Sequence, residues 1–208
     1  MSRTLPPVNA VRSLQRMNEA KMPFLTDIKE LQRRAREHVE KGAVTPAYKG
    51  DLETSIKLLN AALATEIVCT LRYRRHHYMA SGIHYQSVAD EFMEHAVEEQ
   101  RHADLIAERI RQLGGAPDFN PEGLLTRSHA QYAEGQSLLD MIKEDLIAER
   151  IAIESYMEII RYFGNDDPTS RRMMEEILAK EEEHADDLAT LLETLDPREP
   201  TAPLTTKH

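Results

Sequence analysis

The chain is poor in the residues that small disulfide-rich or β-rich domains depend on, with one cysteine, no tryptophan, eight glycines and 5% aromatic residues among 208. One cysteine excludes a disulfide framework within the chain, which fits a reducing cytoplasm as the expected location. Few aromatics and glycines favour long helices over a sandwich or barrel. No uninterrupted apolar run approaches the ~18 residues of a transmembrane helix, and the first residues lack the apolar core of a secretory signal, so no membrane partner is expected.

Charged residues, by contrast, make up 30% of the chain, and the formal net charge is −10. An acidic balance argues against a simple nucleic-acid binder and favours the attraction of cations. The charge is unevenly distributed, because residues 1–50 hold ten basic and five acidic residues, a net +5, while the rest of the chain carries −15. The sequence therefore divides into parts of opposite electrostatic character.

We separate a basic N-terminal helical extension (1–50) from a main domain (51–195) and a flexible proline-rich tail (196–208). Five apolar residues of the extension recur at helical spacing and predict one amphipathic helix that ends near Gly42: Phe24, Ile28, Leu31, Ala35 and Val39. The extension could contact DNA phosphates. Its apolar stripe more simply indicates a helix that packs on the bundle or on a neighbouring subunit, so DNA is the less favoured partner.

Four long helices are predicted in the main domain. They run from about Asp51 to Ala80, Gln86 to Leu113, Ser137 to Phe163, and Pro168 to just before Pro197. Asp51 is a good N-cap, and Asp167 caps a helix whose first residue is Pro168, a position where proline is favoured. Asp145 lies beside the apolar stripe of the third helix and is interpreted as a polar residue at the bundle edge.

The connections between these helices differ in length. Short links join the first helix to the second and the third to the fourth, which forces antiparallel hairpins. The stretch from Gly114 to Gln136 is long enough to run the length of a bundle, and Leu124 to Ala133 is expected to form a short helix within it. The predicted fold is therefore all-α: a four-helix bundle of two antiparallel hairpins joined by one long crossover, with the N-terminal helical extension.

The pattern Glu-x-x-His occurs twice, at Glu99–His102 and Glu181–His184, 82 residues apart (181 − 99). A lone glutamate precedes each copy at a matched distance: Glu66 lies 33 residues before the first and Glu149 lies 32 before the second. A helix puts residues i and i+3 on one face. One such pair in a glutamate-rich chain is more often a solvated helix face, but two copies with matched partners indicate a metal cage.

The expected metal ligands are Glu66, Glu99, His102, Glu149, Glu181 and His184. Four buried carboxylates carry a charge of −4, which two divalent ions would balance. Glu99 and Glu181 are expected to bridge the ions, with one terminal glutamate and one imidazole for each. This ligand set is typical of iron or manganese, between which the sequence does not decide, and Zn²⁺ could occupy the site as an inhibitor.

Leu59 to Leu195 resembles bacterioferritin and the Dps-like ferritins that share its di-iron site. The matching stretches are Leu59–Glu66, Glu99–Asp104, Glu108–Gly115, Asp145–Glu149 and Met174–His184. The resemblance implies a ferritin-like fold and a ferroxidase that oxidises two Fe²⁺ ions per subunit with O₂ or H₂O₂ and stores ferric mineral in a hollow homo-oligomeric shell. It also places Tyr73 beside the di-iron centre among the candidate catalytic residues, although Tyr73 could equally be a core aromatic residue with a satisfied hydroxyl.

Departures from the family pattern refine these expectations. Gln100 stands where bacterioferritin carries its haem-ligating methionine, so haem is not expected. The chain lacks the fifth helix of 24-subunit ferritins and has a long crossover and an extended N-terminus, which favours a Dps-like shell of 12 subunits. Cys69 is the single cysteine, so the cysteine pair of some Dps-like proteins cannot form within a subunit, and Cys69 is expected to be a small buried residue.

Two other functions remain open on the same cage: a di-manganese catalase or peroxidase without storage, and a Dps-type nucleoid-binding protein. A group of polar residues on the second helix is also open to two interpretations, as the lining of a cavity where mineral nucleates or as an exposed helix face: Glu91, Glu94, His95 and Glu98.

Overall fold

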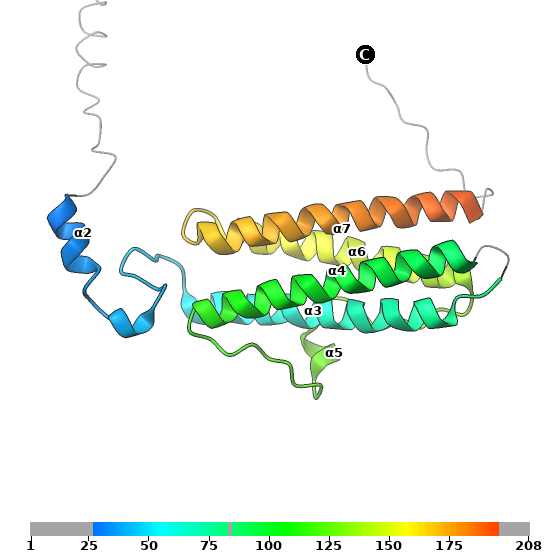
Figure 1. Cartoon of the computed structure of the whole chain (residues 1–208), viewed down its shortest axis with the longest axis horizontal. Helices are drawn as coiled ribbons and strands as arrows, with labels where there is room; N and C mark the ends of the chain where they lie inside the picture. The colour runs from blue at the N-terminus through cyan, green and yellow to red at the C-terminus, as the bar shows by residue number, and fades with distance from the viewer. Residues whose placement is uncertain (1–26, 83–84, 196–208) are drawn as a thin grey trace, which may run out of the picture. The chain divides into compact units, whose positions relative to one another are not determined.

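The computed structural model describes residues 27–82 and 85–195, which contain six α-helices and no strand. The four long helices are α3 (Leu52–Met79), α4 (Tyr85–Gln112), α6 (Leu138–Phe163) and α7 (Pro168–Leu195) (Figure 1). The predicted all-α, ferritin-like four-helix bundle is confirmed, and each helix begins and ends beside its predicted boundary. The predicted flexible tail, 196–208, lies outside the described residues.

The helix ends follow from local chemistry. The predicted caps each accept a backbone N–H of the first turn, Asp51 from Thr54 at 2.8 Å and Asp167 from Ser170 at 2.9 Å, and Ser137 caps the third long helix in the same way by accepting from Asp140 at 3.1 Å. At the end of α4, Gly114 adopts a φ of +82°, and the N–H of Gly115 donates to the carbonyl of Ile110 at 2.9 Å. This is the Schellman arrangement, in which glycine takes the left-handed position without the cost of a Cβ.

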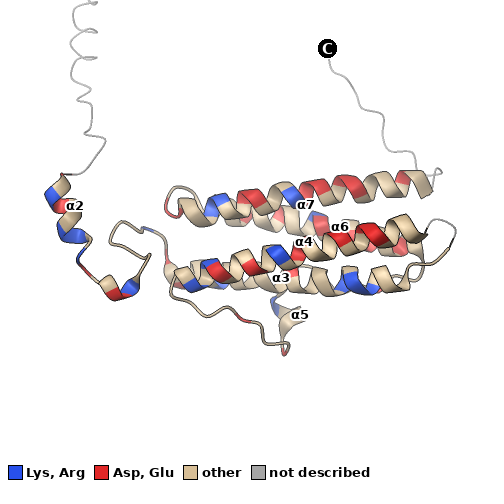
Figure 2. Cartoon of the chain, in the orientation of Figure 1, with Lys and Arg blue, Asp and Glu red and all other residues tan. Residues whose placement is uncertain are grey.

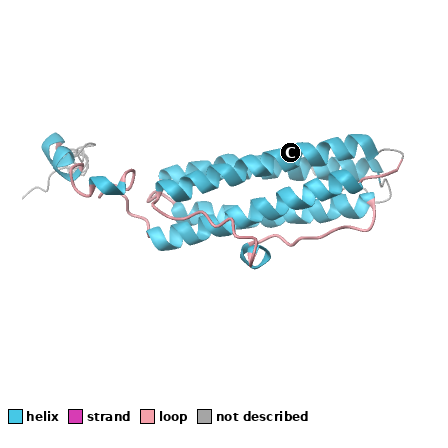
Figure 3. Cartoon of the chain, turned by 60° about the horizontal axis from the view of Figure 1, so that its bottom comes forward, coloured by secondary structure: helices cyan, strands magenta, loops and turns pink. Residues whose placement is uncertain are grey.

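Two antiparallel hairpins build the bundle, because α3 packs along α4 and α6 packs along α7. The crossover between α4 and α6 runs along the bundle and contains the short helix α5 (Leu124–Arg127), which is shorter than expected (Figure 3). Leu124 packs on Ala64 and Val68 and so holds the crossover against α3. The crossover thereby covers part of the helix that carries Glu66.

The mean hydropathy of α3 is high, although the helix contains no long uninterrupted apolar run. It is the helix in the described chain that is long and apolar enough to span a membrane, with a mean hydropathy of 1.2 over its most apolar window. That window is 56% buried in the bundle, where it contributes Leu59, Leu63 and Val68 to the core. A central bundle helix has this composition because several of its faces pack against neighbours.

The prediction that Asp145 lies at the bundle edge is wrong, because its side chain is fully buried. One carboxylate oxygen accepts from the Nε of Arg72 at 2.7 Å, and the other lies 2.7 Å from the Nδ1 of His76. Arg72 also donates to the carbonyl of Gln131 at 2.8 Å. A charge is tolerated in the core here because it is paired and hydrogen-bonded.

The described residues 27–46 belong to a unit separate from the bundle. They contain α2 (Ile28–Arg34) and a 3₁₀ turn (Val39–Lys41), and none of the residues in these two elements is buried. The single amphipathic helix predicted up to Gly42 is therefore wrong over this range, and Phe24 lies outside the described residues. His38, with a φ of +53°, separates the two elements.

Candidate dinuclear metal centre

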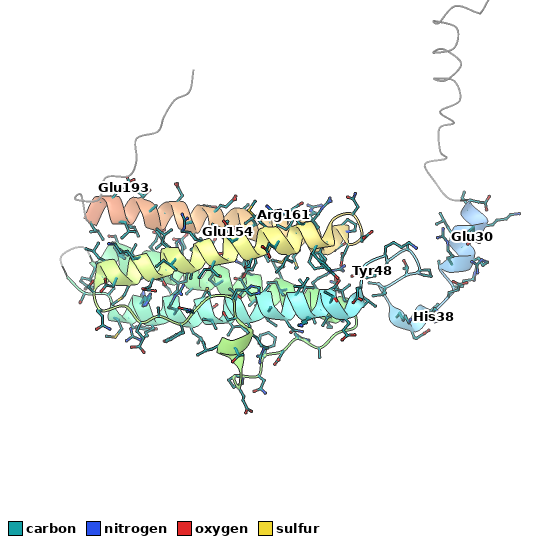
Figure 4. The ribbon with its side chains drawn as sticks, turned by 180° about the vertical axis from the view of Figure 1, so that it is seen from behind. Glu30, His38, Tyr48, Glu154, Arg161 and Glu193 are labelled. Carbon is teal, nitrogen blue, oxygen red and sulfur yellow. The ribbon has the colours of Figure 1, made fainter. Side chains whose placement is uncertain are left out.

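All four long helices contribute to one buried site. Glu66 lies on α3, Glu99 and His102 on α4, Glu149 on α6, and Glu181 and His184 on α7. Each of the six residues is at most 5% exposed. The opposite face of α6 is turned outward, as Glu154 and Arg161 show (Figure 4). The structure thus brings together the six residues that the sequence pattern selected.

The six side chains form two overlapping groups. Glu66 and His102 share one group with Glu99 and Glu181, and Glu149 and His184 share the other group with the same two glutamates. Within each group the ligand atoms lie within 4.8 Å of one another. Two groups that share two carboxylates are arranged to hold two ions with Glu99 and Glu181 between them.

Each histidine turns its Nδ1 atom toward carboxylates of both hairpins. His102 Nδ1 lies 3.0 Å from Glu181 Oε1 and 3.4 Å from Glu66 Oε2. His184 Nδ1 lies 3.2 Å from Glu99 Oε1 and 3.7 Å from Glu181 Oε2. The imidazole of each Glu-x-x-His pair therefore faces the glutamate of the other pair, Glu181 for His102 and Glu99 for His184, a relation that the sequence alone does not reveal.

The hydrogen-bond pattern fits metal ions. Seven buried polar atoms in the cage have no hydrogen-bond partner: Glu66 Oε2, Glu99 Oε1, His102 Nδ1, Glu149 Oε2, both oxygens of Glu181, and His184 Nδ1. A buried polar atom without a partner costs free energy, and native structures leave few of them. Carboxylate oxygens and imidazole nitrogens are the donors that iron and manganese accept, so two divalent ions would satisfy these atoms and balance the charge.

Two tyrosines each donate a hydrogen bond to a glutamate of the opposite hairpin. The Tyr73 hydroxyl donates to Glu149 Oε1, and the Tyr156 hydroxyl donates to Glu66 Oε1. Burial and the neighbouring glutamates raise the pKa of both phenols well above 10, so both stay protonated donors. Each tyrosine occupies one oxygen of a terminal glutamate and leaves the other oxygen without a partner. Tyr156 was not among the predicted site residues, although its spacing of seven residues from Glu149 matches that of Tyr73 from Glu66.

Burial and mutual repulsion also act on the bridging carboxylates. Desolvation and then the charge of the neighbouring glutamates raise the pKa of Glu99 and Glu181 well above the usual 4.5. Burial alone would raise the pKa of Glu66, but the neighbouring Glu99 and His102 side chains and the Tyr156 hydroxyl hold it below its usual value. The raised pKa values favour protons on Glu99 and Glu181 in the absence of metal, and cations bound between them would displace these protons.

Two further residues lie against His184. Its Nε2 lies 2.7 Å from Glu98 Oε2, and its ring stacks on that of His95 with centroids 4.0 Å apart. A carboxylate on the second nitrogen fixes the orientation of a ligating imidazole and makes it more basic. Burial and the charge of His184 lower the pKa of His95 to about 3, so that ring is neutral. The acidic surroundings of Glu98 and His95 were recognised in the sequence, but their contacts with His184 were not.

A four-helix bundle with this buried cage of carboxylates and imidazoles defines the class of ferritin-like di-metal proteins. Residues 56–197 match the ferritin-like domain family. The bacterioferritin BfrA of Mycobacterium tuberculosis is 31% identical over 142 residues, which cover 68% of this chain and 85% of that protein. The chain belongs to the ferritin-like family, and bacterioferritins are among its relatives.

Solved structures agree with this assignment. The bacterioferritin-related protein of Bacteroides fragilis, a dodecameric thioferritin, superposes with a TM-score of 0.68 at 34% identity, covering 71% of this chain and 89% of that one. The bacterioferritin of Desulfovibrio desulfuricans, whose diiron site is known in different catalytic states, superposes with a TM-score of 0.62 at 27% identity, covering 71% and 85%.

Proposed function

We propose that this protein is a ferroxidase that stores iron, and that it oxidises Fe²⁺ with O₂ or H₂O₂ at the cage within each subunit. The observation that carries the proposal is the set of seven unpartnered ligand atoms in a buried, acidic cage. Membership of the ferritin-like family and the likeness to bacterioferritins support iron over manganese. The cytoplasm remains the predicted location.

Fe²⁺ is the substrate as well as the occupant of the cage. Two Fe²⁺ ions give up one electron each, and with H₂O₂ and two protons they yield two Fe³⁺ and two water molecules. Glu99 and Glu181, which belong to both ligand groups, would hold both cations and would release their protons on binding them. Glu66 and Glu149 each present one free oxygen, because Tyr156 and Tyr73 hold the other. Tyr73 thus acts as a positioning residue for Glu149.

We further propose that the subunits assemble into a hollow shell of 12 that receives the ferric product. The dodecameric state of the Bacteroides fragilis relative supports this number over 24. The acidic residues along α4 and α7 (Figure 2) are compatible with attraction of cations to the bundle.

An anaerobic Fe²⁺ titration followed by O₂ or H₂O₂ tests the proposal. We expect rapid oxidation that saturates near two Fe²⁺ per chain, and then continued uptake into particles whose mass corresponds to about 12 chains plus mineral. A protein that never takes up more than the cage holds would contradict storage. Mn²⁺-dependent H₂O₂ dismutation without iron uptake would instead favour the catalase, and salt-sensitive DNA retardation that disappears without residues 1–50 would favour nucleoid binding.

A further inference from the structure

A second cluster of metal-ligand types lies outside the dinuclear cage. Glu91 and His95 on α4 and Asp187 on α7 place one potential ligand atom each within 4.8 Å of the others. His95 Nε2 lies 3.4 Å from Glu91 Oε1 and 3.9 Å from Asp187 Oδ2. Two donor atoms bound to one ion at ~2.1 Å lie roughly 3.0–3.4 Å apart at angles of ~90–110°, so only a small closure of Asp187 is needed.

Ring contacts, and no hydrogen bond from Nδ1, hold His95 in place in this cluster. Its side chain is 2% exposed, and Nδ1 is buried without a partner. The ring stacks on His184 and meets the edge of Tyr73 at a centroid distance of 5.2 Å. These contacts aim Nε2 at the two carboxylates. Glu91 and Asp187 are 32% and 46% exposed, so they can adjust to a cation and leave coordination positions open to water.

The internal repeat provides a control for this interpretation. Adding 82 to the numbers of Glu91 and His95 gives Met173 and Ile177, and subtracting 82 from that of Asp187 gives Leu105. All three counterparts are apolar, whereas the ligands of the cage keep their residue type across the repeat. The bundle therefore does not require polar residues at these positions, and the cluster is a feature of one side of the cage only.

We propose that Glu91, His95 and Asp187 form a third metal site, which binds one first-row divalent cation beside the dinuclear centre. One neutral imidazole and two carboxylates suit Fe²⁺, Mn²⁺, Co²⁺ or Zn²⁺. The bound cation offsets the repulsion between the two carboxylates. The stacked rings of His95 and His184 separate this ion from the cage, while the exposed carboxylates open it to solvent.

Anaerobic Co²⁺ binding to the full-length, metal-stripped protein tests the site. The variants are Asp187→Ala and, as a matched control with the same charge change, Asp186→Ala, since Asp186 is exposed and outside the cluster. We expect Asp187→Ala to lower the affinity for one Co²⁺ ion per chain by at least ~10-fold. Removing a ligand should reduce the affinity by no less than removing an outer-shell partner does. Asp186→Ala should bind like the unchanged protein. Equal binding by the two variants would overturn the proposal.

A cage variant, Glu99→Ala with Glu181→Ala, separates this inference from the proposed function. In that background two ions per chain should be lost while the one sensitive to Asp187→Ala remains. If the cage variant loses none but Asp187→Ala still loses one, the third site stands and the cage assignment fails. Anomalous diffraction from Co²⁺-soaked crystals of the unchanged protein gives a direct answer: we expect a peak between the three side chains, and a map without one refutes the site.

Discussion

The two halves of the cage are alike in their ligands and different in what surrounds them. Each half has a terminal glutamate, an imidazole and a tyrosine from the opposite hairpin that holds the glutamate. Around the imidazoles the likeness ends, because His184 has Glu98 on its Nε2 and His95 against its ring. The residues that correspond to Glu98 and His95 on the other side are Lys180 and Ile177.

This difference separates two requirements on the sequence. Two ions bound between shared carboxylates need matched ligands, so the repeat keeps Glu-x-x-His and the lone glutamates. The outer contacts are under no such requirement and differ between the halves. We infer that the His184 half binds its ion more tightly, because a carboxylate partner raises the basicity of a ligating imidazole.

Removing what the two halves share should have the largest effect. Glu99→Ala with Glu181→Ala deletes both bridging ligands, and we expect the initial rate of Fe²⁺ oxidation to fall by more than ~100-fold, beyond the 10–100-fold typical of outer-shell losses. Stopped-flow absorbance of ferric product measures the rate. Glu94→Ala with Glu182→Ala is the matched control, because both glutamates are exposed on the same two helices. Unchanged oxidation in the cage variant would refute the cage as the site of oxidation.

Removing the outer contact of one half should weaken one ion and spare the other. Glu98→Gln takes the charge from the partner of His184, and we expect the affinity for one of the two cage ions to drop by about 10- to 100-fold. Glu94→Gln removes the same charge from an exposed position on α4 and should change either affinity by less than roughly threefold. Calorimetric titration with Co²⁺ in an Asp187→Ala background, which weakens the proposed third site, resolves the two steps. Equal losses in the two variants would show that the asymmetry has no energetic consequence.

Substitutions of Tyr73 and Tyr156 test whether the two halves of the cage contribute equally to stability. Tyr73→Phe and Tyr156→Phe each remove the donor to a buried glutamate of the opposite hairpin, so each should destabilise the metal-free protein by a similar amount, about 1–3 kcal/mol. The thermal midpoint at fixed protein concentration measures this loss. Tyr162→Phe is the control, since Tyr162 is 42% exposed on α6. A large loss from one variant and none from the other would show that the two crossed contacts are not equivalent.

The sequence predicted what depends on local chemistry or on repetition. Asp51, Ser137 and Asp167 begin their helices because capping involves residues two or three apart, and the cage was visible because it occurs twice. The contacts between the two hairpins could not be predicted from the sequence. Nothing near Tyr73 indicates that its hydroxyl bonds a glutamate 76 residues away.

For Asp145 and the N-terminal extension, the local sequence pattern led to a wrong prediction, because contacts with the rest of the chain, or their absence, decided the structure. Asp145 looked like an edge residue because an isolated charge is costly in a core, but Arg72 from a distant part of the chain pairs with it. In the extension the apolar stripe predicted one helix. The structure has two short elements there with no buried residues, which leaves the stripe without the packing that stabilises amphipathic helices.

The smallest effect concerns the protons on the shared carboxylates. Burial raises the pKa of Glu99 and Glu181 in the folded, metal-free protein above the 4.5 of the unfolded chain. The folded state therefore binds these protons more tightly, and their contribution to stability is complete below pH 4.5 and is lost as the pH rises through the folded pKa. With a chelator present, the thermal midpoint should fall with rising pH more steeply than in a Glu99→Gln, Glu181→Gln variant. Added Mn²⁺ should reverse the trend in the unchanged protein only, because metal binding displaces the protons and tightens as the pH rises. Parallel pH profiles for the two proteins would show that the shared carboxylates are already ionised without metal, and the cage would then need another source of charge compensation.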